Sequence, residues 1–262
     1  MSPVEPVRRF KVDELEVLVY ESDALMGRAA SSEARELIRR AIAGKGRANL
    51  ILACANSQRS FLHALREEPG IDWSRVNVFH MDEYLGIDPD HPASFPQFLH
   101  QHFLNFVGAR EFYPLPSRPE DAERACRDYQ ALLERHPADL VALGFGENGH
   151  LAFNDPPYAD FDDSSWVKVV ELAPESRTQQ VGEGHFSSLA EVPTHAITLT
   201  IPALLAAERM LCLVPEARKA EAVRACLKEP ISEDRPGSIL RRAGHATLYL
   251  DRDSAALLEQ AG

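Results

Sequence analysis

Short apolar segments with strand character alternate with helical segments along nearly the whole chain. This order favours an α/β fold, because each strand of such a chain is followed by a helix that packs on the sheet and leads to a neighbouring strand. The expected strands are Leu15–Tyr20, Ala48–Ala53, Val76–Met81, Asp139–Leu143, Trp166–Leu172, Ala196–Thr200, Leu211–Val214 and Ala246–Leu250.

The segments between these strands carry helical periodicity with recognisable start and stop signals. Ser22 and Asp23 can cap the first helix, which is expected to run to about Ala43 before Gly44. The other expected helices run from Ser57 to about Glu68 and over His91–Val107, Pro119–His136, Ile201–Ala207, Ala217–Leu227 and Ser254–Gln260. No repeat or linker interrupts this order. We therefore predict one domain spanning residues 1–262, built as a three-layer α/β sandwich with a mostly parallel central sheet.

The charge balance argues against general nucleic-acid binding, because 40 acidic and 28 basic side chains among 262 residues give a net charge of −12. A local basic pocket for one anionic metabolite remains compatible with that charge. No apolar run reaches the roughly 18 to 20 residues that span a bilayer, and the N-terminal segment lacks the apolar core of a signal peptide. The four cysteines show neither metal-ligand spacing nor a disulfide framework. We expect a reduced, cytoplasmic protein without a nucleic-acid or membrane partner.

Three expected strand ends carry polar clusters, and ligands of α/β sheets bind at the carboxyl ends of the strands. The first cluster follows the strand Ala48–Ala53, where the chain turns into a helix at Asn56 and Ser57. A hydroxyl group and free backbone amides at the start of a helix form an anion site, above all for phosphate. The alternative is that Ser57 only caps the helix.

The second cluster consists of Asp82 and Glu83, directly after the strand Val76–Met81. Strand alternation turns neighbouring side chains to opposite sides, so only one of the two can point squarely into a given pocket. A carboxylate at this place suits proton abstraction beside a carbonyl group, provided that burial raises its pKa towards neutrality. The alternative is a helix cap beside a solvated acid.

The third cluster lies in the segment Asp139–Pro156, which begins as a buried strand and breaks at two glycines. It presents Asn148, His150 and Asp155 within eight residues, around Gly149. His150 can move protons near neutral pH, and Asn148 and Asp155 can orient its ring. The alternative is a Gly-His pair that only shapes the loop.

Two further groups of residues are candidates for binding an anion or a metal ion. Lys219 lies at the start of an expected helix, where it can reach an anion or remain a solvated lysine. His100 and His102 are two residues apart on an expected helix and therefore face different ways. These two histidines therefore make a poor metal pair.

Taken together, these segments resemble the glucosamine-6-phosphate deaminase/isomerase family, whose superfamily includes the 6-phosphogluconolactonases. The similarity is strongest in F-H-M-D-E-Y-L-G-I, H-P-A-S-F-P-Q-F-L and G-F-G-E-N-G-H-L-A-F-N-D-P, and extends from about Leu50 to Asp251 in the family's order. The run Leu151–Pro156 resembles the deaminase branch rather than the lactonase branch. The resemblance implies a Rossmann-like α/β sheet.

In that family a sugar phosphate ring opens, a proton moves between C2 and C1, and the C2 amine leaves as ammonia. The resemblance implies that Asp82 handles the C2 proton and that His150 acts in ring opening, assisted by the residues at Asn148 and Asp155. It implies no redox cofactor and no obligatory metal.

The resemblance also implies a set of substrate-binding positions. Lys219 and Ser57 match residues that hold the phosphate, and the neighbouring positions Asn56, Glu83 and Gly149 complete the expected set. The expected partner is a small sugar phosphate. The oligomeric state stays open, and a homo-oligomer is compatible with the sequence.

The chain departs from the family pattern at several of these positions. Cys54–Gln58 replaces the usual Thr-Gly-Gly or Thr-Gly-Ser followed by Thr-Pro. Gly182 stands where a phosphate-binding arginine is expected after Trp166, and Arg177 matches a different arginine. Asp155 replaces a glutamate and is one methylene shorter.

These departures leave four functions open. The leading hypothesis is an isomerase/deaminase that converts glucosamine 6-phosphate, or a related amino-sugar phosphate, to the ketose phosphate and ammonia. The alternatives are an isomerase acting on a different or unphosphorylated sugar, a hydrolase of the 6-phosphogluconolactonase type, and a sugar-phosphate sensor without turnover.

Overall fold

A central eight-stranded sheet organises the chain in the computed structural model, which describes residues 4–182 and 184–258. Its strand order is β1-β2-β11-β10-β7-β3-β4-β6. All neighbouring strands are parallel except β1 and β2. The strands are β1 (Arg8–Val12), β2 (Leu15–Tyr20), β3 (Ala48–Leu52), β4 (Val76–His80), β6 (Glu111–Tyr113), β7 (Leu140–Leu143), β10 (Arg209–Val214) and β11 (Ala246–Asp251). The mostly parallel sheet that the sequence predicts is confirmed.

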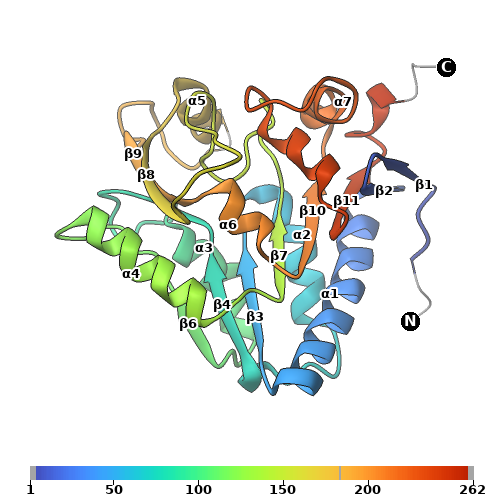
Figure 1. Ribbon diagram of the computed structural model, residues 1–262, viewed down its shortest axis with the longest axis horizontal. Helices are drawn as coiled ribbons and strands as arrows, with labels where there is room; N and C mark the ends of the chain where they lie inside the picture. Colours follow the sequence, from blue (N-terminus) through green and yellow to red (C-terminus); the bar gives the residue numbers. More distant parts are fainter. Residues whose placement is uncertain (1–3, 183, 259–262) are drawn as a thin grey trace.

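Helices cover both faces of this sheet, which makes three layers (Figure 1). One face packs against α1 (Asp23–Lys45), α2 (Arg59–Arg66) and α3 (Phe95–His102). The other face packs against α4 (Ala122–Arg135), α6 (Ile201–Leu205) and α7 (Ala220–Lys228). The Rossmann-like three-layer architecture is therefore confirmed.

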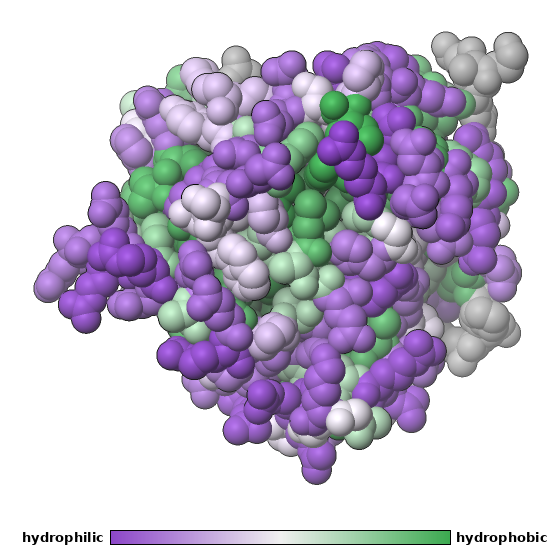
Figure 2. Space-filling view, viewed as in Figure 1, coloured by the Kyte–Doolittle hydropathy of each residue, from purple (hydrophilic) through white to green (hydrophobic). Residues whose placement is uncertain are grey.

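Two hydrophobic cores lie between the layers because side chains alternate along each strand. In β3, Leu50 and Leu52 belong to the core under α1, α2 and α3, whereas Ile51 belongs to the core on the opposite face. All three side chains are at most 2% exposed. The outer surface is mainly hydrophilic in the face shown in Figure 2.

A second, smaller sheet lies at the carboxyl ends of the parallel strands. It has the antiparallel order β5-β9-β8 and consists of β5 (Asp82–Tyr84), β9 (His195–Leu199) and β8 (Val167–Glu171). The arrows of β3, β4, β7 and β10 point to the top of Figure 1, where β8, β9 and α5 (Pro174–Gly182) lie. The two strands expected near residues 166–172 and 196–200 thus exist, but they form a separate sheet that carries Asp82.

Several element boundaries differ from the prediction for local physical reasons. The first helix passes Gly44 and ends at Gly46, whose φ of +77° suits a glycine at a helix C-terminus. The helix expected over residues 91–107 is confined to α3, because the chain leaves helical geometry at Phe103. It then forms a 3₁₀ turn and the edge strand β6, which the sequence did not predict.

The last expected helix, Ser254–Gln260, is represented by the short 3₁₀ helix η6 (Ala256–Leu258), and residues 259 and 260 lie outside the described residues. The antiparallel edge strand β1 and the helix α5 were not predicted either. Within the described ranges, no helix combines the length and apolar character needed to cross a membrane.

Candidate active site

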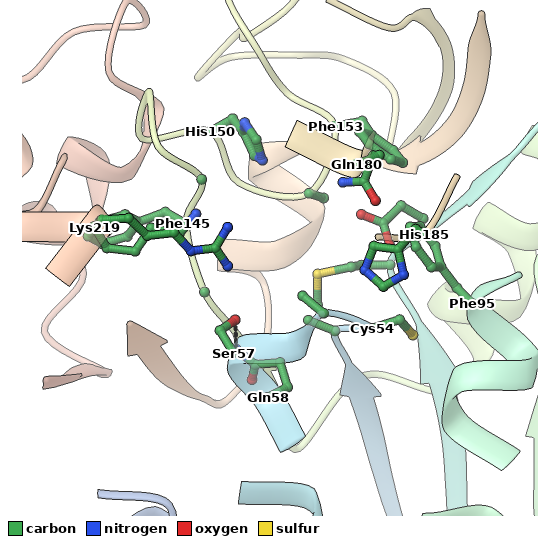
Figure 3. Close-up of a pocket in the computed structure, with 18 residues that line it drawn as sticks. Cys54, Ser57, Gln58, Phe95, Phe145, His150, Phe153, Gln180, His185 and Lys219 are labelled. Atoms are coloured by element: carbon green, nitrogen blue, oxygen red, sulfur yellow. Dashed lines mark hydrogen bonds between the residues drawn. The ribbon is translucent and has the colours of Figure 1, made fainter. Parts of the chain in front are cut away.

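A cavity opens at the carboxyl edge of the central sheet, where the loops after β3, β4, β7 and β10 meet. Each of these loops contributes to its lining, and α5 with the segment after it closes another side through Gln180 and His185. In the view of Figure 3, Ser57 and Gln58 lie across the cavity from His150, and Lys219 lies on a third side. The four strand ends therefore bring together residues that are far apart in the sequence.

The loop after β3 forms the short 3₁₀ helix η1 (Asn56–Gln58), which leads directly into α2. Ser57 and Gln58 line the cavity, whereas Asn56, an expected substrate-binding residue, is not among the lining residues. Neither η1 nor α2 has a side-chain cap, so the Ser57 hydroxyl is not used as a helix cap here. The geometry leaves the start of α2 facing the cavity, which favours an anion.

Gln58 ties this loop to β10 and lies close to Gly144, where the loop after β7 begins. Its Nε2 donates to the carbonyl oxygen of Leu213 and to Ser57 Oγ, each at 3.3 Å. A Cβ atom on Gly144 would lie 2.7 Å from the Leu213 oxygen and 3.1 Å from Gln58 Nε2, so a glycine is required at this close approach.

Asp82 and Glu83 take different directions, as strand alternation requires. Asp82 lines the cavity and is 8% exposed. Glu83 accepts hydrogen bonds from Ser94 Oγ at 2.9 Å and from the backbone nitrogens of Tyr84 and Phe95 at 2.8 and 3.2 Å. Glu83, which we expected to bind substrate, is therefore not among the lining residues and instead holds the start of α3.

Burial changes the acidity of both carboxyl groups. Burial, followed by the nearby charge of Glu83, raises the pKa of Asp82 to about 8. Burial also raises the pKa of Glu83 to about 7, although its hydrogen bonds from Tyr84, Ser94 and Phe95 oppose this change. Asp82 is thus a cavity carboxyl group that can exchange a proton near neutral pH, as a general base must.

The loop after β7 folds back tightly so that His150 lies over Gly146. The Gly146 nitrogen donates to the His150 oxygen at 3.0 Å, and a Cβ atom on Gly146 would lie 2.1 Å from His150 Cε1. Gly149 makes the turn with a φ of +84°, and its oxygen accepts from the Gly237 nitrogen at 2.7 Å. Gly149 therefore shapes the loop and is not among the lining residues that we expected it to join.

A buried carboxylate orients the ring of His150. His150 Nδ1 lies 2.9 Å from Asp155 Oδ1, and Asp155 is 2% exposed. The same oxygen accepts from Asn148 Nδ2 at 2.8 Å and from Ser176 Oγ at 2.7 Å, while Asn148 Oδ1 accepts from the His150 nitrogen. Asp155 thus reaches the imidazole despite being one methylene shorter than a glutamate.

Burial alone would raise the pKa of Asp155, but the charge of His150 and the hydrogen bonds from His150, Asn148 and Ser176 outweigh it and lower that pKa. When His150 is neutral, an ionised Asp155 favours the tautomer that carries the ring proton on Nδ1, which leaves Nε2 to act on a ligand. The arrangement matches the general pattern of a base whose partner carboxylate fixes its tautomer.

Two basic side chains follow β10 in the short 3₁₀ helix η4 (Ala217–Lys219), and both line the cavity. Lys219 is 4% exposed. Arg218 was not predicted, although its place beside Lys219 in the sequence could have signalled it. Gln180 and His185 were also missed, because they lie in a polar segment without a recognisable pattern.

Arg177 does not reach this cavity. Its Nη2 donates to the backbone oxygens of Leu189 and Val192 at 2.7 and 2.9 Å, which holds the chain between α5 and β9. Gly182 is exposed and lines an adjoining hollow that shares His150 and Arg218 with the cavity. Among the described residues, no cluster of three or more histidine, cysteine or acidic side chains could hold a metal ion.

The fold and the site define a Rossmann-like α/β protein whose cavity, at the carboxyl edge of its sheet, is lined by Asp82, His150 and two basic side chains. A family model described as glucosamine-6-phosphate isomerases/6-phosphogluconolactonase matches residues 21–249. The chain belongs to this family.

Individual relatives agree with this assignment. A glucosamine-6-phosphate deaminase from Exiguobacterium sibiricum is 36% identical over 190 residues, which cover 72% of this chain and 73% of the relative. A solved structure of a monomeric glucosamine-6-phosphate deaminase matches with a TM-score of 0.84 at 28% identity, covering 92% of this chain and 99% of its own. A 6-phosphogluconolactonase from Shewanella baltica shares the fold, with a TM-score of 0.71 at 17% identity over 92% of this chain and 99% of its own.

Proposed function

We propose that this chain is a glucosamine-6-phosphate deaminase, which converts glucosamine 6-phosphate to the ketose phosphate and ammonia. The observation that carries the proposal is the meeting of Asp82, the His150–Asp155 pair and Lys219 around one cavity. Two separate proton-handling groups and a cation are what an isomerisation of a sugar phosphate requires. The deaminases among the relatives support the same reaction.

His150 acts first, on the closed ring. Its Nε2 accepts the proton of the anomeric hydroxyl and returns a proton to the ring oxygen, which opens the sugar to the aldehyde. Asn148 and Asp155 hold the imidazole for this step. The product is an open-chain 2-amino aldehyde with an acidic proton at C2.

Asp82 acts next. Its carboxylate removes the C2 proton to form an enolamine and delivers a proton to C1, which leaves a C2 imine. Water adds to C2, and the C–N bond breaks to release ammonia and leave the ketose. A pKa near 8 suits both directions of this transfer, because the group can be a base and then an acid at neutral pH.

Lys219 and Ser57 bind the phosphate, beside the starts of α7 and α2. Both helices begin beside the cavity, and the positive end of a helix dipole favours an anion at such a place. This arrangement favours a phosphorylated substrate over an unphosphorylated sugar. We further propose that the protein is cytoplasmic and that residues 1–262 form a single domain.

Ammonia release from glucosamine 6-phosphate tests the proposal, measured by a coupled assay together with deuterium exchange at C2 in D₂O. The wild type should release ammonia, and Asp82→Asn should abolish both signals. Binding without exchange would instead support a sensor. Hydrolysis of 6-phosphogluconolactone with no ammonia release would support the lactonase reaction and refute the deaminase.

A further inference from the structure

The loop after β10 presents a second cation beside Lys219. Arg218 lines the cavity and also the adjoining hollow, so it lies where the two spaces meet. The segment in which an arginine was expected, residues 166–182, contributes no arginine to either lining, since Arg177 bonds to backbone oxygens of residues 189 and 192. Arg218 is therefore the arginine that the described lining offers to an anion.

The backbone that carries Arg218 is held in an unusual conformation. Glu216 has a φ of +81° and a ψ of 141°, a region that residues with a side chain rarely adopt and that costs of order 1–3 kcal/mol. Asp251, which is 5% exposed, holds this turn, because its two carboxylate oxygens accept from the Glu216 nitrogen at 3.1 and 3.3 Å. A buried carboxylate thus fixes the backbone turn that leads to Arg218.

Among the residues that the structure describes, the side chains of Glu216 and Glu147 contact the guanidinium group. Nε donates to Glu216, and Nη1 lies 3.4 Å from Glu147 Oε1 in the loop that also carries His150. Glu147 is 49% exposed and Arg218 is 34% exposed. Ion pairs of this exposure contribute little free energy, so a phosphate can displace Glu147 at small cost.

Charge balance in the cavity calls for such a residue. A phosphate monoester carries about −1.5 to −2 charges at neutral pH, whereas Lys219 supplies only one positive charge. A guanidinium group offers paired N–H donors in a planar fork that match phosphate oxygens, which the compact ammonium group of a lysine does not.

We propose that Arg218 is the second phosphate-binding cation of this site and that it exchanges Glu147 for the substrate phosphate when the sugar binds. This inference rests on the proposed function for the identity of the substrate. It makes Glu147 a competitor of the phosphate, and it makes Asp251 and Glu216 positioning residues. Because Glu147 lies next to Asn148, the exchange also frees the loop that holds His150 from its contact with Arg218.

The test measures inorganic phosphate binding by calorimetry and KM and kcat for glucosamine 6-phosphate. Arg218→Gln should raise the Kd for phosphate and the KM about ten- to a hundredfold, with kcat changed less than about threefold. Arg218→Lys should recover part of the affinity. The matched control is Arg224→Gln on α7, where Arg224 pairs with Glu221 and Glu229 outside the cavity lining; its values should stay within about twofold of the wild type.

Glu147→Gln is a variant for which we expect tighter phosphate binding, a change that misfolding would not produce. It should tighten phosphate binding about two- to fivefold, and this gain should vanish in the double variant with Arg218→Gln. Phosphate affinity that is unchanged in both Arg218→Gln and Glu147→Gln overturns the proposal.

The outcomes also separate this inference from the proposed function. Ammonia release by the wild type with an unchanged KM in Arg218→Gln supports the deaminase and refutes the role of Arg218. No ammonia release, combined with weaker phosphate binding in Arg218→Gln, refutes the deaminase and supports Arg218 as an anion ligand.

Discussion

Replacement of Asp82 by asparagine tests the raised pKa of this carboxyl group through protein stability, independently of turnover. The folded-state pKa of about 8 lies above the ordinary value of 3.8, so between these values the folded state binds one more proton than the unfolded state. Wild-type stability from this group is therefore fully present below about pH 4 and is lost as the pH rises towards 8. Asparagine has no such dependence, because it does not titrate.

The size of the effect follows from the slope. One proton of difference changes the free energy of unfolding by roughly 1.4 kcal/mol per pH unit. From pH 5 to pH 7, the stability of Asp82→Asn relative to the wild type should therefore rise by about 3 kcal/mol. Urea unfolding of both proteins at pH 5, 6 and 7 measures this difference. The pH dependence that Glu83 and other groups contribute is present in both proteins, so it largely cancels when the two free energies of unfolding are subtracted.

The exposed Asp128 on α4 provides a matched control, since its carboxyl group is 70% exposed. Asp128→Asn should change stability by less than about 0.5 kcal/mol at each pH. A difference between Asp82→Asn and the wild type that stays constant from pH 5 to pH 7 would refute a raised pKa at Asp82. It would also remove the physical basis for Asp82 as the proton-transfer group.

Two further variants examine the His150 loop through the rate of ammonia release. Asp155→Asn removes the charge that orients His150 Nδ1, and we expect kcat to fall about 10²- to 10⁴-fold; a rate within threefold of the wild type would contradict the orienting role. Gly146→Ala would place a Cβ atom within 2.4 Å of three ring atoms of His150, so the ring must move and kcat should fall at least about 10²-fold. Gly108→Ala is its control, because no atom lies within 4 Å of the added Cβ, and thermal unfolding should show that both glycine variants remain folded.

Much of the central sheet could be predicted from the sequence, because a strand buried on both faces must be apolar at nearly every position. β2, β3, β4, β7, β10 and β11 are found within one to two residues of the expected ranges. The edge strands β1 and β6 escaped prediction, because their side chains are largely exposed or half-buried and carry a weaker pattern. The small sheet escaped for another reason: the partner of β5 lies more than a hundred residues away in β9.

The candidate site, like the sheet, could be predicted from the sequence only in part. The sequence by itself determined which chemistry was at hand, because Ser57, Asp82, His150 and Lys219 each follow a recognisable strand end or begin a helix. Parallel strands present their carboxyl ends at one edge, so the convergence of these residues followed from the fold class.

Only the tertiary structure decided which neighbours face the cavity. The pairing of β5 with β9 turns Asp82 towards the cavity and Glu83 towards α3. The neighbouring residues in the sequence do not distinguish these two acids. Arg218 enters the site because Asp251, at the end of β11, holds the turn at Glu216, which lies thirty-five residues before Asp251 in the sequence. Such long-range contacts set the direction of a side chain and the burial that shifts its pKa, and both depend on the packed chain rather than on local sequence.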